Sequence, residues 1–97
     1  MKEKVIGYDV SIDEKNRIVV PSSIRRDLNI KNKKTKIFLQ FCGKQLNVSL
    51  ERPKKGYFVP TKIDSQWRLF IPNAKKFFKK SVSVSEFNGG FSIFPKR

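Results

Sequence analysis

One short pattern occurs twice in this chain, and the repetition limits how the protein can fold. The stretch "IDEKNRIVVPSSIRRDL" (12–28) is followed 51 positions later by "IDSQWRLFIPNAKKFF" (63–78). Ile, Asp, Arg and Pro stand at the same offsets in both stretches, with apolar residues between the Arg and the Pro. Two equivalent patterns within 97 residues favour two structurally equivalent units over a single irregular domain.

Short apolar or alternating segments, separated by turn residues, predict that each unit is built mainly from β-strands. Pro21 and Pro72 should end the second strand of each unit, because proline has no N–H to donate, and should start a short helix. Asn29 is expected to end the first helix in the left-handed conformation. The second unit is expected to be one or two residues shorter around its helix. The predicted strands are 8–12, 17–20, 36–41, 46–51, 57–63, 68–71, 82–87 and 91–94.

Neither unit is expected to fold alone, because four short strands and one small helix bury too little apolar surface. Two units packed face to face would share one core and form a pseudo-dimer with approximate two-fold symmetry inside one chain. The segment "RPKKG" (52–56) has no apolar residue and marks the boundary. The predicted fold class is therefore mostly β with two short helices, with residues 1–52 as the first repeat and 53–97 as the second, diverged repeat.

Charge is the strongest functional signal in the sequence. The chain carries 22 Lys and Arg against 8 Asp and Glu, a net charge of +14. Residues 1–52 hold +6 of it (12 basic, 6 acidic) and residues 53–97 hold +8 (10 basic, 2 acidic), so the charge is not confined to a tail. A folded chain of this charge repels itself unless a polyanion is its usual neighbour. Nucleic acid is the first expected partner, with an anionic membrane and an acidic protein as weaker alternatives.

Several classes of site are disfavoured by residue types that are missing or rare. With no His and a single Cys, Cys42, neither a zinc site nor a disulfide framework is expected. Cys42 is expected to be a small, partly buried residue. The "NGG" stretch at 88–90 lacks the Lys-Ser/Thr of a phosphate-binding loop and predicts a hairpin turn instead. With no membrane-spanning run or signal-peptide pattern, we expect a cytoplasmic, non-enzymatic protein without cofactor, metal, membrane contact or small-molecule substrate.

The first of the two stretches also resembles a known family. The sequence "VSIDEKNRIVVPSSIRRDLNI" is similar to the N-terminal DNA-binding domain of the AbrB/SpoVT/MazE family, in which two copies interlock as a swapped-hairpin β-barrel. The resemblance covers about residues 8–50 and, more weakly, 57–95. Two tandem units in one chain resemble the MraZ arrangement, where Asp-x-x-x-Arg occurs twice. The resemblance implies a swapped-hairpin barrel, double-stranded DNA as the partner and a sequence-preferring transcriptional regulator.

The resemblance also implies which residues of the first half contact DNA. Family members use arginines on the loop before the second strand and on the short helix. The matching positions here are Arg17, Arg25 and Arg26. A further family arginine on the first strand falls on Val10, so that contact is missing from this chain.

In the second half the match is partial. Arg68 matches the loop arginine, and Lys75 and Lys76 lie near the positions of the helix pair. The glycine that usually precedes the loop arginine is Asn16 in the first half and Trp67 in the second. Asparagine adopts the left-handed conformation readily, whereas tryptophan does not, so the second turn is expected to have diverged.

The lysines suit a different role from the arginines. Arginine presents a planar fork that fits phosphate or the guanine edge, whereas lysine is a point charge. On this basis the first half should recognise the DNA sequence, and the second half should mainly bind the phosphate backbone of the DNA. The lysines that we expect to contact phosphates without reading sequence are Lys15, Lys62, Lys75, Lys76, Lys79 and Lys80.

Other interpretations stay open. Asp13–Arg17 and Asp64–Arg68 are explained equally well as local ion pairs that hold the turns, which is compatible with DNA binding. A MazE-like antitoxin or protein-interaction module is a second interpretation, although such antitoxins usually carry an acidic tail and this sequence ends in "FSIFPKR". Trp67 is expected to be exposed, and the third interpretation is RNA or single-stranded nucleic acid stacked on it. Self-association into a homo-oligomer is also left open.

Overall fold

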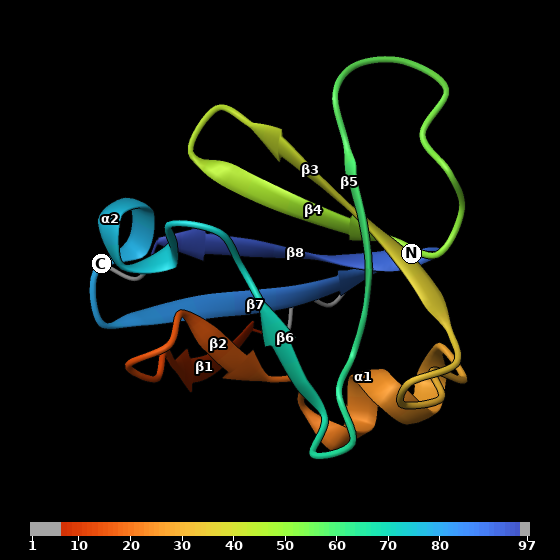
Figure 1. Ribbon diagram of the computed structural model, residues 1–97, viewed down its shortest axis with the longest axis horizontal. Helices are drawn as coiled ribbons and strands as arrows, with labels where there is room; N and C mark the ends of the chain where they lie inside the picture. Colours follow the sequence, from red (N-terminus) through yellow and green to blue (C-terminus); the bar gives the residue numbers. More distant parts are fainter. Residues whose placement is uncertain (1–6, 96–97) are drawn as a thin grey trace.

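The computed structural model describes residues 7–95, which form eight β-strands and two short helices (Figure 1). The mostly β chain with two short helices is confirmed, and no strand end differs from its predicted position by more than two residues. The first half contains β1 (Gly7–Ser11), β2 (Arg17–Val19), α1 (Ser22–Asp27), β3 (Lys36–Cys42) and β4 (Gln45–Ser49). The second half contains β5 (Val59–Lys62), β6 (Arg68–Phe70), α2 (Ala74–Phe78), β7 (Ser81–Phe87) and β8 (Gly90–Pro95).

The strands of the two halves are interleaved. Six of them form one antiparallel sheet in the order β1-β7-β8-β4-β3-β5, and β2 pairs with β6 in a separate two-stranded ribbon. The first strand of each half therefore pairs with the other half, β1 with β7 and β5 with β3. The expectation of two units packed face to face is wrong, because both halves contribute strands to the same sheets. Neither sheet closes on itself in the described part of the chain.

The strand arrangement is unchanged when the two halves are exchanged. Swapping β1 with β5, β2 with β6, β3 with β7 and β4 with β8 reproduces the strand order and every pairing register. Equivalent residues are 51 positions apart as far as the helix and 45 apart from β3 and β7 onward. The second half is thus six residues shorter after its helix, not one or two, because residues 28–35 of the first half correspond to 79 and 80 alone.

One apolar core is made from the alternating residues of both halves. Ile18 and Leu69 on the ribbon lie opposite one another and are buried, as are Leu46 and Ile93 at the β4–β8 junction. Among residues 7–95, the first half and the second half each contribute nine buried apolar residues to this core. Burying one large apolar side chain stabilises a fold by about 1.5–3 kcal/mol, so each half depends on the other for much of its stability.

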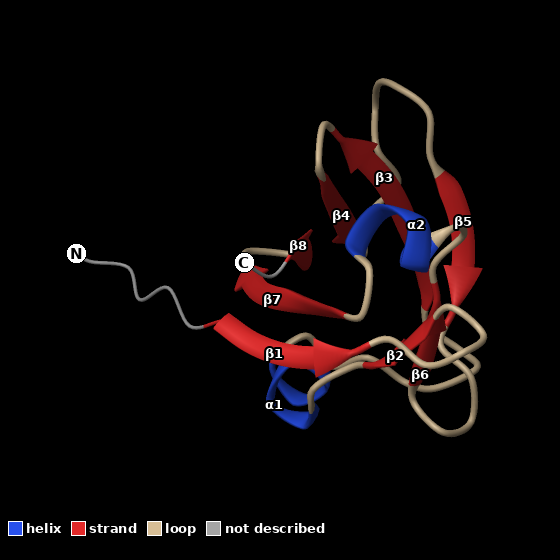
Figure 2. Ribbon diagram, turned by 90° about the vertical axis from the view of Figure 1, so that its left-hand side faces the viewer, coloured by secondary structure: helices blue, strands red, loops and turns tan. Residues whose placement is uncertain are grey.

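The two helices begin and end differently. In α1, Pro21 precedes the first helical residue and Asn29 lies in the left-handed region beyond the end (φ 55), as predicted. In α2, the helix begins at Ala74 and not at Pro72, because Asn73 adopts the left-handed conformation just before it (φ 59). Both helices carry two basic residues in their last turn, where the helix dipole favours cations. Figure 2 shows the two helices on separate parts of the surface, with the β2–β6 ribbon between them.

The "NGG" signal corresponds to the turn between β7 and β8. Gly89 has a positive φ of 91°, which glycine adopts without strain. Gly90 lies so close to β4 that a Cβ atom there would come within 2.1 Å of the carbonyl oxygen of Val48. Both glycines are therefore needed, one for the turn and one for the approach of two strands.

Candidate nucleic-acid interface

The two Asp-x-x-x-Arg segments form the same turn twice. Asp13 accepts hydrogen bonds at Oδ1 from the backbone N–H groups of Lys15 (2.8 Å) and Arg17 (2.9 Å), and at Oδ2 from Nε of Arg17 (2.8 Å). Asp64 repeats the set with Gln66 (2.9 Å), Arg68 N–H (2.9 Å) and Arg68 Nε (2.9 Å). The interpretation as local ion pairs is confirmed. Each carboxylate is paired with the arginine of its own turn.

These contacts change the pKa of both aspartates. Partial burial alone would raise the pKa of Asp13, but hydrogen bonds from Arg17 and from the Lys15 N–H outweigh it and hold that pKa below its usual value. Burial also raises the pKa of Asp64, and hydrogen bonds from Arg68 and Gln66 lower it in the same way. Both turns are therefore held most firmly when the aspartates are ionised.

Replacing Asp13 by Asn tests this account, because Asn keeps an acceptor for the backbone N–H groups and loses the charge that holds Arg17. The folded pKa lies below the unfolded value of 3.8, so the stabilisation is present above that value and is lost as the pH falls through the folded pKa. We expect Asp13→Asn to lower the melting temperature at pH 7, with a difference from wild type that shrinks in acid. Glu14→Gln is the matched control. A difference that persists undiminished in strong acid would contradict the account.

The second turn has not diverged in shape. Trp67 has a φ of 63°, and its counterpart Asn16 has a φ of 62°. The two turns are joined across the ribbon, since Val20 N–H donates to the Trp67 carbonyl and Ile71 N–H donates to the Asn16 carbonyl, both at 2.9 Å. A left-handed tryptophan is uncommon, and the paired backbone around it explains how the conformation is held.

The outer face of the ribbon combines arginines with exposed apolar side chains. Residues that lie opposite one another in an antiparallel pair project to the same face. Arg17 is opposite Phe70 and Val19 is opposite Arg68. Val19 and Phe70 are about half exposed, while the side chains of Arg17 and Arg68 are 25% and 28% exposed. Among the described residues, the side-chain hydrogen bonds of both arginines involve Nε alone, which leaves the terminal Nη atoms available as donors at the surface.

Each turn lies beside the helix of the other half. The Asn16 side chain accepts a hydrogen bond from the N–H of Lys75 in α2 (3.0 Å), and Ile12 N–H donates to the carbonyl of Lys80 (2.9 Å). These contacts bring the turn that contains Arg17 next to the lysines of α2. We call this region the α2 end of the ribbon.

At the opposite end, Trp67 meets α1. The guanidinium carbon of Arg25 lies 4.4 Å from the centroid of the Trp67 ring, a cation–π contact. Trp67 is half-buried and packs against the core, so the expectation that it is exposed is wrong. Nε of Arg25 is buried and has no hydrogen-bond partner among the described residues. We call this region, with Arg26 and Arg68, the α1 end of the ribbon.

This arrangement corrects the predicted grouping of site residues by halves. Arg25 and Arg26 lie with Arg68 of the second half, and Arg17 lies with Lys75 of the second half. The remaining predicted lysines are all exposed. Lys15 is in the first turn, Lys76 is on α2, Lys79 and Lys80 follow α2, and Lys62 ends β5.

Sequence reasoning missed a group of basic residues at the α1 end. The loop after α1 is six residues longer than its counterpart and approaches the second turn. Asn32 Nδ2 donates to the carbonyl of Ser65 (3.0 Å), and Lys33 N–H donates to that of Ile63 (2.6 Å). Lys36 lies opposite Lys62 in the β3–β5 register. The run "KNKKTK" (31–36) was the available signal, but only the tertiary contacts connect it with the second turn. The exposed lysines of this group are Lys31, Lys33, Lys34 and Lys36.

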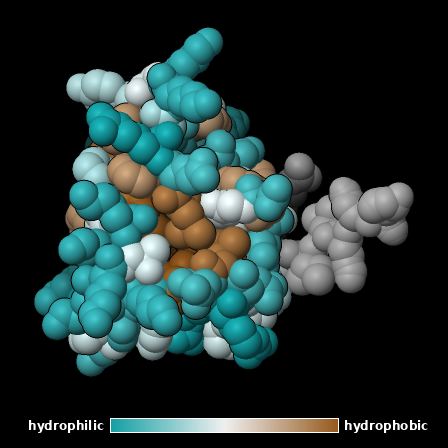
Figure 3. Space-filling view, turned by 90° about the vertical axis from the view of Figure 1, so that its right-hand side faces the viewer, coloured by the Kyte–Doolittle hydropathy of each residue, from teal (hydrophilic) through white to brown (hydrophobic). Residues whose placement is uncertain are grey.

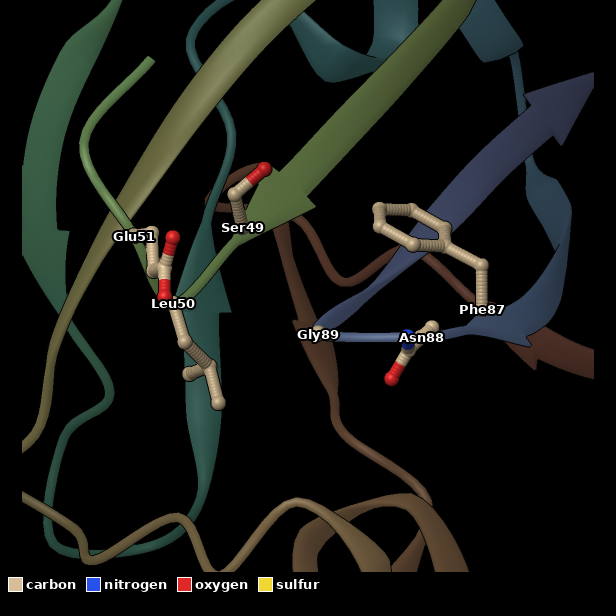
Figure 4. Close-up of a pocket in the computed structure, with 6 residues that line it drawn as sticks. All are labelled: Ser49, Leu50, Glu51, Phe87, Asn88 and Gly89. Atoms are coloured by element: carbon tan, nitrogen blue, oxygen red, sulfur yellow. The ribbon is translucent and has the colours of Figure 1, made fainter.

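One other pocket has few ionisable side chains. Figure 3 shows an apolar hollow in a mostly hydrophilic face, on the side toward which β4 and β7 run. A pocket of about 430 Å³ lies where β4 ends and β7 turns into β8, with Leu50 and Phe87 on opposite sides (Figure 4). Glu51 is the only ionisable side chain among its six lining residues.

Within the part of the chain that the structure describes, the cysteine, possible metal ligands and the helices suggest no further site. Cys42 is exposed at the end of β3, so the expectation of a partly buried cysteine is wrong. Within residues 7–95, no cluster of His, Cys, Asp and Glu side chains is arranged to hold a metal ion. The helices of this region are too short and polar to cross a membrane.

Comparison with known proteins finds no matching family model and no matching curated protein. The resemblance to the AbrB/SpoVT/MazE family therefore stays a prediction from the residues quoted for it.

Proposed function

We propose that this protein binds double-stranded DNA through the outer face of the β2–β6 ribbon and its two ends, and that it acts as a transcriptional regulator. In this proposal the fold is a single-chain version of the swapped-hairpin barrel, with residues 1–52 and 53–97 as its two repeats. The interleaved strand order, which is unchanged when the two halves are exchanged, supports this proposal.

The observation that carries the proposal is the convergence of arginines from both halves on one ribbon. The major groove of DNA admits a two-stranded β-ribbon. Arg17 and Arg68 present free Nη donors on the outer face, and Val19 and Phe70 beside them offer apolar contact of the kind that thymine methyl groups accept. The basic helices lie beyond both ends of the ribbon, where the flanking phosphates would pass.

The two ends would contribute differently. At the α1 end, Trp67 holds the guanidinium of Arg25, and a held planar fork suits the guanine edge. At the α2 end, Asn16 stands in place of Trp67, and the position equivalent to Arg25 is the exposed Lys76. We therefore assign sequence preference to the α1 end and backbone contact to the α2 end, which replaces the division by halves.

Duplex binding over a salt series tests the proposal. If about 5 phosphates are neutralised, a plot of log affinity against log salt should have a slope of roughly −4 to −5. Fluorescence anisotropy of a labelled duplex gives the slope, and light scattering gives the mass of the complex. An unchanged affinity across the series, or no binding at low salt, would rule out the nucleic-acid function.

A further inference from the structure

The internal symmetry allows the two ends of the molecule to be compared position by position. Phe41 on β3 corresponds to Glu86 on β7, and Phe77 on α2 corresponds to Arg26 on α1. At the α1 end these two positions are therefore polar. There, burial and the neighbouring Asp27 carboxylate raise the pKa of Glu86, and the hydroxyl groups of Tyr8 and Ser23 are hydrogen-bonded.

At the α2 end the same place is aromatic and exposed. The rings of Phe41 and Phe77 stack with centroids 4.9 Å apart and an interplanar angle of 26°, yet the two residues are 39% and 50% exposed. Phe41 also lines a hollow of about 200 Å³ together with Val59 and Tyr57, which are 46% and 93% exposed. We call Phe41, Tyr57, Val59 and Phe77 the aromatic patch.

The fold itself does not require these aromatic side chains. The α1 end has equivalent strands in the same register and a helix at the corresponding point of the chain. It accommodates a carboxylate and a guanidinium where the α2 end has two phenyl rings. Large apolar side chains that stay half exposed at positions where polar ones fit are typical of an interaction surface. The aromatic patch is therefore better explained by a partner than by packing.

The charge around the aromatic patch limits what that partner can be. In residues 40–60 and 70–80, the segments that contain the patch, there is one acidic residue, Glu51. A second copy of this chain, with its own net charge of +14, would bring like charges together, so an anionic partner is favoured. The basic residues of these two segments are Lys44, Arg52, Lys54, Lys55, Lys75, Lys76, Lys79 and Lys80.

The shape of the aromatic patch favours a polypeptide over a nucleic-acid strand. A single strand stacks its bases on free ring faces, but Phe41 and Phe77 already cover one face of each other. The hollow beside them, lined by Leu39, Val59 and Phe58 among others, is smaller than the roughly 300–1,000 Å³ of pockets for drug-sized ligands. It has room for one large apolar side chain.

We propose that the aromatic patch is a docking site for an acidic polypeptide segment that inserts one large apolar side chain between Phe41, Tyr57 and Val59. Carboxylates on either side of that anchor would meet the surrounding lysines. Aromatic and large aliphatic anchors with a polar rim are the usual composition of such sites. The aromatic side chains are not part of the ribbon face, but the lysines of the α2 end belong to both surfaces. Peptide binding is therefore measured without DNA, and its outcome does not depend on duplex binding.

A random dodecapeptide library displayed on phage, selected against the whole chain, tests the proposal. We expect the selected peptides to combine Asp or Glu with an aromatic residue or Leu, and synthetic copies to bind in solution. The proposal would be overturned if the selection recovered no binding peptides, or peptides that lack the acidic residues or the large apolar residue. Oligo-dT is tested in parallel, and tighter binding of oligo-dT than of the peptides at the same patch would assign the surface to single strands instead.

The matched variant places the residues of the α1 end at the equivalent positions of the α2 end. The double substitution Phe41→Glu and Phe77→Arg keeps the net charge and introduces side chains that the fold already carries at the equivalent positions. We expect the selected peptides to bind it at least about tenfold more weakly. Phe87→Ser, at another exposed phenylalanine (40%), should bind them as wild type does. A melting curve shows whether both variants fold. If the double variant does not fold, Phe77→Arg alone is tested in its place. Equal binding by the folded variant would overturn the proposal.

Discussion

A chain that ends at residue 52 is expected to have no cooperative unfolding transition as a monomer. Truncation removes a strand partner from every first-half strand: β7 from β1, β6 from β2, β5 from β3, and β8 from β4. Of the eighteen buried apolar residues in the described part of the chain, it removes nine. At about 1.5–3 kcal/mol for each large side chain, this loss is at least comparable to the 5–15 kcal/mol by which a whole domain is stable.

Circular dichroism melts and light scattering measure the outcome of the truncation. The fragment should either stay unfolded or associate, with a second copy supplying the missing strands. Mixing it with a fragment that begins at residue 53 is the control. The two fragments together contain every strand pairing and lack only the peptide bond between residues 52 and 53. A monomeric fragment with a cooperative transition would contradict the account of a shared core.

The second large effect is expected at the α1 end of the ribbon. On a duplex selected for tight binding, Arg25→Ala should cost about 1–3 kcal/mol if the guanidinium contacts a guanine, with little effect on scrambled duplexes. Lys76→Ala, at the equivalent position of the α2 end, should weaken all sequences alike and make the salt slope shallower by about one unit. Titration of each variant against selected and scrambled duplexes measures the difference.

Substitutions of Trp67 show whether it acts by positioning Arg25. Trp67→Asn gives the second turn the residue of the first, which tolerates the left-handed conformation. It should keep the fold and reduce discrimination as Arg25→Ala does. Trp67→Phe keeps a ring beneath the guanidinium and should retain much of the discrimination. If Lys76→Ala loses discrimination and Arg25→Ala does not, the two ends are assigned the wrong way round.

Local sequence was a reliable guide to local structure here. Short apolar or alternating segments identified all eight strands, and Asp13 and Asp64 marked both turns because each side chain contacts groups within four residues of itself. Pro21 and Asn29 bounded α1 for equally local reasons. The length of the connection after α2 was harder to predict, because a loop has no hydrophobic period to count.

The composition of the two ribbon ends could not be predicted in the same way. Trp67 stands among polar residues in the sequence, so its burial beneath Arg25, 42 positions earlier, leaves no local signal. The same holds for Asn32, which contacts Ser65 across the two halves. Grouping arginines and lysines by half assumes separate units, whereas the interleaved halves place Arg25 against Trp67 and the Arg17 turn against Lys75.

The sequence by itself determined the elements, the two turns, the basic charge and the fact that each half repeats the other. The tertiary structure alone decided which strands pair. Because both halves carry the same alternating pattern, β1 fits β7 of the other half as well as it would fit β3 of its own, and period-two alternation specifies a face but not a partner. The exchange of first strands then places each turn against the opposite helix. For that reason the paired Arg25 and Trp67, and the stacked Phe41 and Phe77, are features of the fold that no single segment contains.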